Sequence, residues 1–255
     1  MGTKNDKKWN KKQWSKNYGD AKIGFWNPWF YSNERHEYSK SLNLDILGLG
    51  ELHNLHDKTQ YKEKRWICSD TTKIKDGKST DPAAGVAILL SKRMADKIMS
   101  SGSVGTRIVW ARLEGPVCNL FVIVVYIPHK GRSNPCAQDT INQIKVLLST
   151  VRSHDCIILM GDFNCQLRRN VSGCTGKWCM TKRKDNGHGE EMLNLLRRFD
   201  LFAVDTLFKP ARKALGEKKR MRYCTGNVTH VTPEAKIMSK RLQMSHKRLV
   251  LDLSV

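Results

Sequence analysis

The sequence lacks any long apolar run. Its longest, Leu120 to Ile127, has eight residues, whereas a membrane-spanning helix needs about 18 or more. The first 22 residues are polar and rich in lysine, and they contain no apolar segment of the kind found in a secretory signal. We therefore expect a nuclear or cytoplasmic protein that neither crosses a membrane nor is secreted.

Acidic residues are scarce relative to basic ones. The chain has 45 Lys and Arg against 24 Asp and Glu, a net charge of +21. The excess is concentrated at the two ends: residues 1–22 carry +5 and residues 209–255 carry +9. Such a charge favours a polyanionic partner. DNA is therefore the predicted partner, with RNA as the alternative, and we expect no membrane and no obligate protein partner. The competing interpretation, a basic protein that binds nothing in particular, is simpler but is not the one favoured by the charge.

The chain has no Cys-x-x-Cys pair among its eight cysteines. Without a secretory signal, this distribution predicts reduced thiols rather than a disulfide framework. Cys174, Cys179 and His188 leave a zinc site open as a weaker alternative.

Short apolar runs alternate with helical patterns from Lys22 onward. Strands are predicted at residues 23–26, 44–49, 85–90, 108–113, 120–127, 156–160 and 201–204, and helices at 140–152 and 189–199. We divide the chain into a flexible basic tail (1–21), one domain (22–210) and a divergent basic segment (211–255), in which residues 249–255 form the one plausible closing strand.

Several predicted strands are β-branched throughout, so both of their faces are expected to be buried. Together with hairpins and crossovers, this predicts an α/β fold: a four-layer α/β sandwich of two packed mixed sheets flanked by helices, with its final strands in doubt.

A polar pair follows the most regular of these strands. Ile157 to Met160 leads into Gly161, and Asp162 and Asn164 come next. Their i, i+2 spacing on extended chain places both side chains on one face, where they can hold a water and a phosphate oxygen. The alternative is an Asx turn that caps the strand.

Three further strands end in a polar side chain. Glu51 follows the strand at 44–49, where a carboxylate suits a hard cation that binds oxygen ligands. Tyr126 ends the most apolar strand, and Asn27 follows the strand at 23–26. Each has a structural alternative: an exposed strand-end carboxylate, or a core tyrosine with its hydroxyl bonded.

Taken in order, these four motifs resemble the endonuclease/exonuclease/phosphatase superfamily, over residues from about 22 to 210. Residues 185–190 and 205–208 look more particularly like the apurinic-type endonuclease domain of non-LTR retrotransposons. The resemblance implies a two-sheet sandwich and Mg²⁺-dependent cleavage of a phosphodiester, with Mn²⁺ as an alternative metal.

The resemblance also implies a role for each motif residue. Glu51 would ligate the metal with help from Asn27. Tyr126 would bind phosphate or stabilise charge, Asp162 would orient the attacking water, and Asn164 would contact the phosphate. A basic surface would add non-specific DNA affinity through counterion release.

The late motifs of the superfamily are not intact. Gln243 stands where a late Asp is expected, and no Ser-Asp-His follows. His246 and Asp252 are doubtful candidates for the missing groups. We therefore predict a DNA endonuclease from a retroelement that is weakly active or inactive. The alternatives are a catalytically dead nucleic-acid-binding protein, and a phosphatase or phosphodiesterase acting on small or lipid phosphates.

Overall fold

The architecture is taken from a computed structural model of the chain. It describes residues 21–28, 32–53, 66–70, 74–75, 78–79, 85–115, 118–128, 134–178, 188–207 and 248–252. Within these ranges the chain forms two mixed β-sheets with helices on their outer faces, and the helices are all too short or too polar to cross a membrane.

The smaller sheet has four strands in the order β1-β2-β6-β3. Its strands are β1 (Ile23–Trp26), β2 (Ile46–Leu49), β6 (Ala87–Leu90) and β3 (Trp66–Cys68). β1 and β2 are parallel, with Trp26 opposite Leu49, so both end at the same edge. β6 is antiparallel to both of its neighbours. A separate pair, β4 (Ile74–Lys75) and β5 (Lys78–Ser79), completes this part of the chain.

The larger sheet has six strands in the order β11-β12-β10-β9-β8-β7. They are β7 (Ile98–Val104), β8 (Ile108–Leu113), β9 (Asn119–Tyr126), β10 (Asp155–Asp162), β11 (Leu201–Ala203) and β12 (Arg248–Asp252). β9, β10, β12 and β11 run parallel, whereas β7, β8 and β9 form antiparallel pairs. β12 thus comes from the predicted C-terminal segment and separates β10 from β11.

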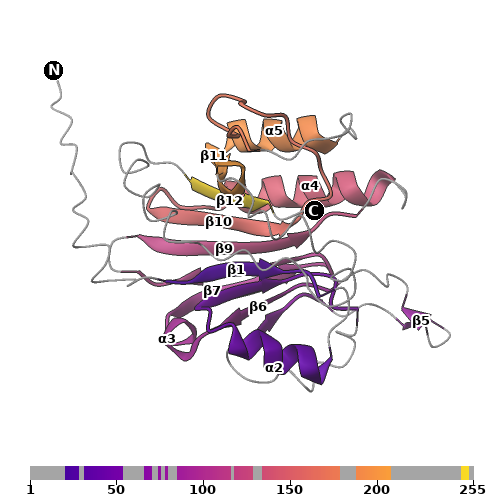
Figure 1. The fold of residues 1–255 in the computed structure, drawn as a ribbon, viewed down its shortest axis with the longest axis vertical. Coiled ribbons are helices and arrows are strands. Elements are labelled where there is room, and N and C mark those ends of the chain that lie inside the picture. Colours follow the sequence, from indigo (N-terminus) through magenta and orange to yellow (C-terminus); the bar gives the residue numbers. More distant parts are fainter. Residues whose placement is uncertain are drawn as a thin grey trace, which may run out of the picture.

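The helices complete four layers, as Figure 1 shows. They are α2 (Asn33–Ser41), α3 (Lys92–Ala95), α4 (Asn134–Ser149) and α5 (His188–Arg198), with a short 3₁₀ turn at Val204–Leu207. α4 and α5 cover the outer face of the larger sheet, and α2 lies on the outer side of the smaller sheet. The predicted four-layer α/β sandwich is confirmed.

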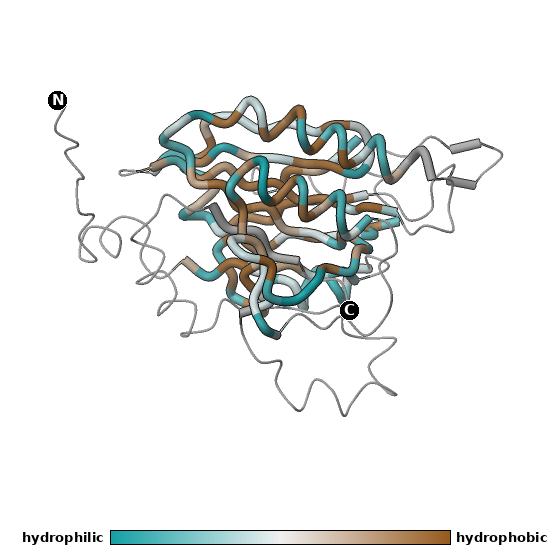
Figure 2. Tube along the Cα trace, turned by 90° about the horizontal axis from the view of Figure 1, so that it is seen from above, coloured by the Kyte–Doolittle hydropathy of each residue, from teal (hydrophilic) through white to brown (hydrophobic). Residues whose placement is uncertain are grey.

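The core consists of three hydrophobic clusters, one between each pair of layers. Side chains in a strand alternate between its two faces, and β9 illustrates this: Val122 and Val124 pack between the sheets, whereas Phe121 and Ile123 pack under α4 and α5. All eight residues of β9 are buried. In Figure 2, seen from above, hydrophobic residues (brown) are frequent in the central part of the described chain. The β-branched strands are therefore covered on both faces, as predicted.

The two sheets approach closely at Gly48 in β2. A Cβ atom added there would lie 2.8 Å from Met160 Sδ and 2.9 Å from Val124 Cγ2, both in the larger sheet. Glycine therefore lets β2 pack directly on β10 and β9. This close approach brings the ends of strands from both sheets to one rim.

Most of the predicted elements are present, with shifted ends. The helix predicted at 140–152 is α4, which begins six residues earlier at Asn134, and the closing strand predicted at 249–255 is β12. α2, α3, β3 and β7 were not predicted. The tail at 1–20 lies outside the described residues.

Candidate functional site

Two of the predicted site residues meet across the sandwich. Asn27 directly follows β1 of the smaller sheet, and Asp162 ends β10 of the larger one. Asn27 Nδ2 donates a hydrogen bond to Asp162 Oδ2 at 3.1 Å, although 135 positions separate the two residues along the chain. A rim between the two sheets is therefore lined by an amide and a carboxylate from separate motifs.

The Asp162 carboxylate is held on its other oxygen by its own loop. The backbone amide of Asn164 donates to Asp162 Oδ1 at 3.1 Å, which is the Asx turn given above as the structural alternative. Asn164 is 8% exposed, and its Nδ2 donates to the Ile127 carbonyl at 2.8 Å. The backbone amide of Ile127 in turn donates to the Asp162 carbonyl at 2.9 Å. Each carboxylate oxygen thus has a fixed direction, so Asp162 is oriented without a ligand.

Glu51 lies at the same edge of the smaller sheet as Asn27. It follows β2, whose neighbour β1 ends at Trp26, and the amide of Gly50 donates to the Trp26 carbonyl at 3.1 Å. Glu51 is half-buried and has a φ of 47°, a left-handed backbone that is uncommon for a residue with a long side chain. The strand pairing therefore places Glu51 at the same edge of the smaller sheet as Asn27, one residue beyond the position level with it.

Tyr126 is paired in register with Asp162 but is more deeply buried. It ends β9, is 2% exposed, and belongs to the hydrophobic cluster between the sheets. Its backbone amide donates to the Arg107 carbonyl at 3.0 Å. The ring therefore forms the apolar floor behind the rim, and its predicted role toward phosphate stays a prediction.

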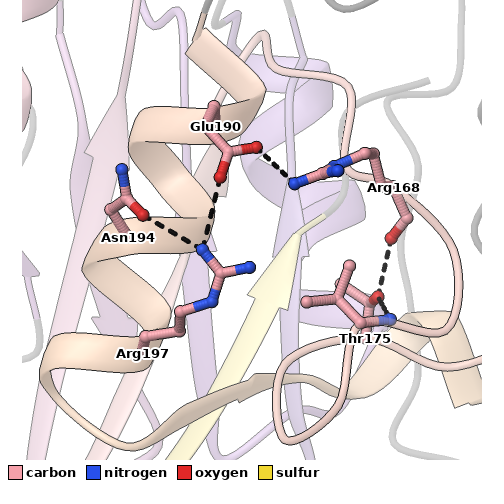
Figure 3. Close-up of polar contacts among 6 residues, drawn as sticks. Arg168, Thr175, Glu190, Asn194 and Arg197 are labelled. Carbon is pink, nitrogen blue, oxygen red and sulfur yellow. Dashed lines mark hydrogen bonds and ion pairs between the residues drawn. The ribbon is translucent and has the colours of Figure 1, made fainter.

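The loop that follows Asn164 is fastened to α5. Arg168 Nη2 lies 2.6 Å from Glu190 Oε2, and Arg197 Nη1 lies 3.3 Å from the other oxygen of the same carboxylate (Figure 3). Thr175 Oγ1 closes the loop by donating to the Arg168 carbonyl at 2.6 Å and accepting from the Val171 amide at 3.0 Å. The loop that carries Asn164 is therefore joined to α5 at its far end through exposed ion pairs.

The remaining candidates differ in how far the structure describes them. His246 and Gln243 of the late motifs lie outside the described residues. Cys179 of the weaker zinc alternative lies outside them as well. Asp252 ends β12, and the strand register places it opposite Gly161, next to Asp162. A late acidic residue thus reaches the same edge of the sheet by its position in the ladder.

Two backbone groups at the rim were not predicted. The Ile127 carbonyl holds Asn164, and the Arg107 carbonyl holds the amide of Tyr126. Both act through main-chain atoms, which any residue type supplies, so no side-chain signal in the sequence could have identified them. His53, with a φ of 49°, lies on the loop after Glu51 and was likewise not singled out.

The site residues offer oxygen ligands, the kind that a hard divalent cation prefers. Among the described residues, no cluster of three or more His, Cys, Asp or Glu side chains forms a ready cage for a metal. Mg²⁺ usually binds through one or two carboxylates and keeps several waters. Glu51 and Asn27 supply oxygen ligands at this edge, a ligand type that suits Mg²⁺ better than zinc.

Comparison with curated proteins gives distant relatives. No family model matches the chain. The chain is 24% identical over 180 residues to craniofacial development protein 2 of Bos taurus, a match that covers 68% of this chain and 28% of that protein. The same protein of Tragulus javanicus is 23% identical over 180 residues. The chain thus spans less than a third of the length of these relatives.

Solved structures with a similar fold include the endonuclease domain of TRAS1, a telomere-specific non-LTR retrotransposon. It is 13% identical, with a TM-score of 0.44, and the match covers 70% of this chain and 72% of that one. An endonuclease/exonuclease/phosphatase family protein from Leptotrichia buccalis is 18% identical, with a TM-score of 0.38 and coverage of 57% and 67%.

Proposed function

We propose that the chain is a metal-dependent phosphodiesterase of the DNA endonuclease type, of retroelement origin, and slow because its late motifs are incomplete. The observation that carries this proposal is the hydrogen bond between Asn27 and Asp162, which joins two motifs 135 positions apart at one rim. The order of the motifs and the net charge of +21 support the same function.

In this proposal Glu51 and Asn27 hold Mg²⁺, or Mn²⁺ as the alternative. Asn27 uses Nδ2 toward Asp162, which orients its carbonyl oxygen, the atom suited to a cation, away from that carboxylate. A bound divalent ion supplies positive charge against the phosphodiester, which otherwise repels a nucleophile.

Asp162 orients the attacking water. Its carboxylate is fixed by hydrogen bonds at both oxygens, and such preorganisation contributes to the rate because the group does not need to reorient during the reaction. Asn164 positions Asp162 through its amide and would contact the phosphate only with the part of its side chain that Ile127 does not engage. Tyr126 would stabilise charge from behind the rim.

The proposal includes a low rate. The superfamily uses a late histidine with a supporting acid, and Gln243 and His246 do not restore that arrangement in the sequence. Loss of a general acid–base group costs about 10²–10⁴ in rate. Asp252 is the late acid that the β12 register favours, because it lies opposite Gly161 at the site edge.

Nicking of supercoiled plasmid tests the proposal. We expect slow nicking that requires Mg²⁺ or Mn²⁺ and stops on addition of EDTA. Asp162→Ala should abolish nicking. In a separate variant, Asp252→Asn should lower the nicking rate by more than any loss of stability explains. The matched control is Asp139→Ala, which removes an exposed carboxylate from α4 and should leave the rate unchanged.

The outcome also decides between the proposal and its main alternative. Turnover equal to that of an intact member of the superfamily would contradict the low rate. Wild-type protein that binds DNA but shows no metal-dependent nicking above the Asp162→Ala background would instead identify a nucleic-acid-binding protein without catalysis. The incomplete late motifs favour this alternative over any other.

A further inference from the structure

Two half-buried cysteines lie at the amino ends of two inner strands of the larger sheet, at the end of the sheet opposite the candidate site. Cys118 directly precedes β9, and Cys156 is the second residue of β10, paired with Leu120. β9 and β10 are parallel, so both thiols lie at the amino ends of adjacent strands. Asn119 and Tyr126 are seven residues apart, which corresponds to about 23 Å of extended chain between this edge and the rim.

The two thiols are in hydrogen-bond contact. The hydrogen bond that Cys156 donates lowers the pKa of Cys118 below that of an ordinary thiol, whereas burial and the negative charge of Asp155 act in the opposite direction. A thiol with a lowered pKa has a larger thiolate fraction at neutral pH and reacts faster with disulfides.

The charge of Asp155 is largely compensated by its own partners. Arg112 Nη2 lies 3.1 Å from Asp155 Oδ2, in an ion pair whose side chains are 10% and 0% exposed. Asn119 Nδ2 donates to Asp155 Oδ1 at 3.3 Å, and the backbone amide of Arg152 donates to Oδ2 at 3.0 Å. With its oxygens engaged in this way, Asp155 opposes a thiolate at Cys118 less than an unpaired carboxylate would.

The other described cysteines differ from this pair in burial or in position. Cys165 and Cys174 are buried at 7% and 1% exposure, which protects them from reagents in solution. Cys68 is half-buried like the pair, but it lies in β3 of the other sheet. Among the described residues, Cys118 and Cys156 therefore combine access to solvent with a partner thiol.

We propose that Cys118 and Cys156 form a reversible disulfide, a redox modification site that cross-links the amino ends of β9 and β10. Leu120 lies opposite Cys156, so Cys118 is its diagonal neighbour, on the same face of the sheet and one residue before the first pair of the ladder. Disulfide formation would therefore draw Cys118 toward Cys156, to the Cα separation of about 4.4–6.8 Å that a disulfide requires. The oxidant is a low-molecular-weight disulfide such as oxidised glutathione.

The reaction is a two-step exchange. The Cys118 thiolate attacks one sulfur of the small disulfide, forms a mixed disulfide with it, and releases the other half as a thiolate. Cys156 then loses its proton and attacks the Cys118 sulfur, which forms the protein disulfide and releases the second thiolate. Two protein thiols lose two electrons, the small disulfide gains them, and the protons end on the two released thiols.

Peptide mapping of the wild-type protein tests the proposal. The protein is incubated with oxidised glutathione, remaining thiols are alkylated, and the digest is analysed without reduction. We expect one cross-linked peptide pair containing Cys118 and Cys156, lighter by two hydrogen atoms and separated by dithiothreitol. Closing a long loop constrains the unfolded chain, so the oxidised protein should melt about 5–10 °C higher than the reduced one.

Single serine variants provide the controls. Cys118→Ser and Cys156→Ser should each lose the cross-link, whereas Cys68→Ser, which removes a comparably exposed thiol from the other sheet, should keep it. Separate glutathione adducts on Cys118 and Cys156, or full alkylation of both in the oxidised wild type, would overturn the proposal. The wild-type map decides the question even where a variant does not fold.

Discussion

Among single residues, Glu51 combines a position in the candidate site with an unfavourable backbone. Its φ of 47° is left-handed, as is the φ of 45° at Asn164. Asparagine tolerates this region because its short side chain bonds locally, but glutamate does not. Such conformations persist where the surrounding structure holds them and are common at functional sites. The left-handed backbone at Glu51 is therefore an expected cost to stability.

Glycine at position 51 should relieve this strain. We expect Glu51→Gly to be more stable than Glu51→Ala by about 1 kcal/mol, since only glycine adopts the left-handed region without steric cost. Urea unfolding of both variants measures the difference, and both should lose metal-dependent nicking. Equal stabilities would show that Glu51 is not strained.

Asp45 supports a pH-dependent prediction. Burial acts to raise its pKa, but hydrogen bonds from Arg93, the Lys22 amide and Ser91 outweigh it and lower the pKa below the usual value. Arg93 Nη2 lies 2.8 Å from Asp45 Oδ2, and Ser91 Oγ donates to Oδ1 at 3.0 Å. These contacts connect the beginnings of β1 and β2 with the beginning of α3.

A carboxyl group with a lowered pKa in the folded state stabilises the protein only while it is ionised. Asp45→Asn should therefore be less stable than wild type at neutral pH. The difference should shrink as the pH falls below the unfolded value of about 3.9. Urea unfolding over a pH series measures this difference in stability. Asp139→Asn, which changes an exposed carboxylate on α4, is the control. A difference that stays constant down to acid pH would contradict the role given to the ionised carboxylate.

The sequence predicted the residues at strand ends but not their partners. Asn27, Glu51 and Asp162 are conspicuous because each polar side chain directly follows an apolar run. The contact between Arg112 and Asp155 was not predicted, because it depends on how β8, β9 and β10 are aligned. Register is set by the whole sheet, so pairings of this kind cannot be read from one strand.

Among whole elements, those with a periodic apolar stripe were predicted from the sequence, and those without one were missed. α5 has buried Met192, Leu195 and Leu196 at helical spacing and was predicted nearly to its ends. α2 has the sequence Asn-Glu-Arg-His-Glu-Tyr-Ser-Lys-Ser, without an apolar stripe, and begins with the Ser32 cap that accepts from the Arg35 amide. The edge strand β7 is rich in serine. Both were missed because they bury too little apolar surface to leave a periodic pattern.

The packing of β2 on the larger sheet gives a prediction for Gly48. A methyl group there would meet Met160 Sδ and Val124 Cγ2 within 3 Å. We expect Gly48→Ala to lower the free energy of unfolding by about 1–3 kcal/mol, because overpacking displaces the two sheets.

A double-mutant cycle shows whether this steric contact is the cause. Met160→Ala removes the sulfur that the new methyl group meets, so Gly48→Ala should cost less in that background than in wild type. Identical costs in both backgrounds would mean that the contact with Met160 is not the cause of the destabilisation. Denaturant unfolding of the four proteins provides the measurement.

For the molecule as a whole, the dominant property is charge. The net charge of +21 is large for 255 residues, and a polyanion bound to such a surface releases counterions. The four-layer fold could be predicted because the central strands, such as β9, are apolar throughout. The order of strands could not, since it depends on long-range pairing that no local pattern encodes.

DNA binding should therefore weaken steeply with salt. For about six phosphate contacts, affinity should fall by about 10³ between 50 and 200 mM salt. Fluorescence anisotropy with a labelled duplex measures the slope. Asp162→Ala should keep the same slope, because it changes the site and not the basic surface. A slope near zero would remove nucleic acid as the partner.

The position of β12 has a consequence for how the chain reaches its native state. β10 and β11 are synthesised well before residues 248–252. In the larger sheet β12 lies between these two strands and is hydrogen-bonded to both. A nascent chain must therefore keep a slot between two parallel strands until the missing strand is synthesised. Insertion into that slot is a late, non-local step, and an unfilled slot exposes two strand edges to other chains.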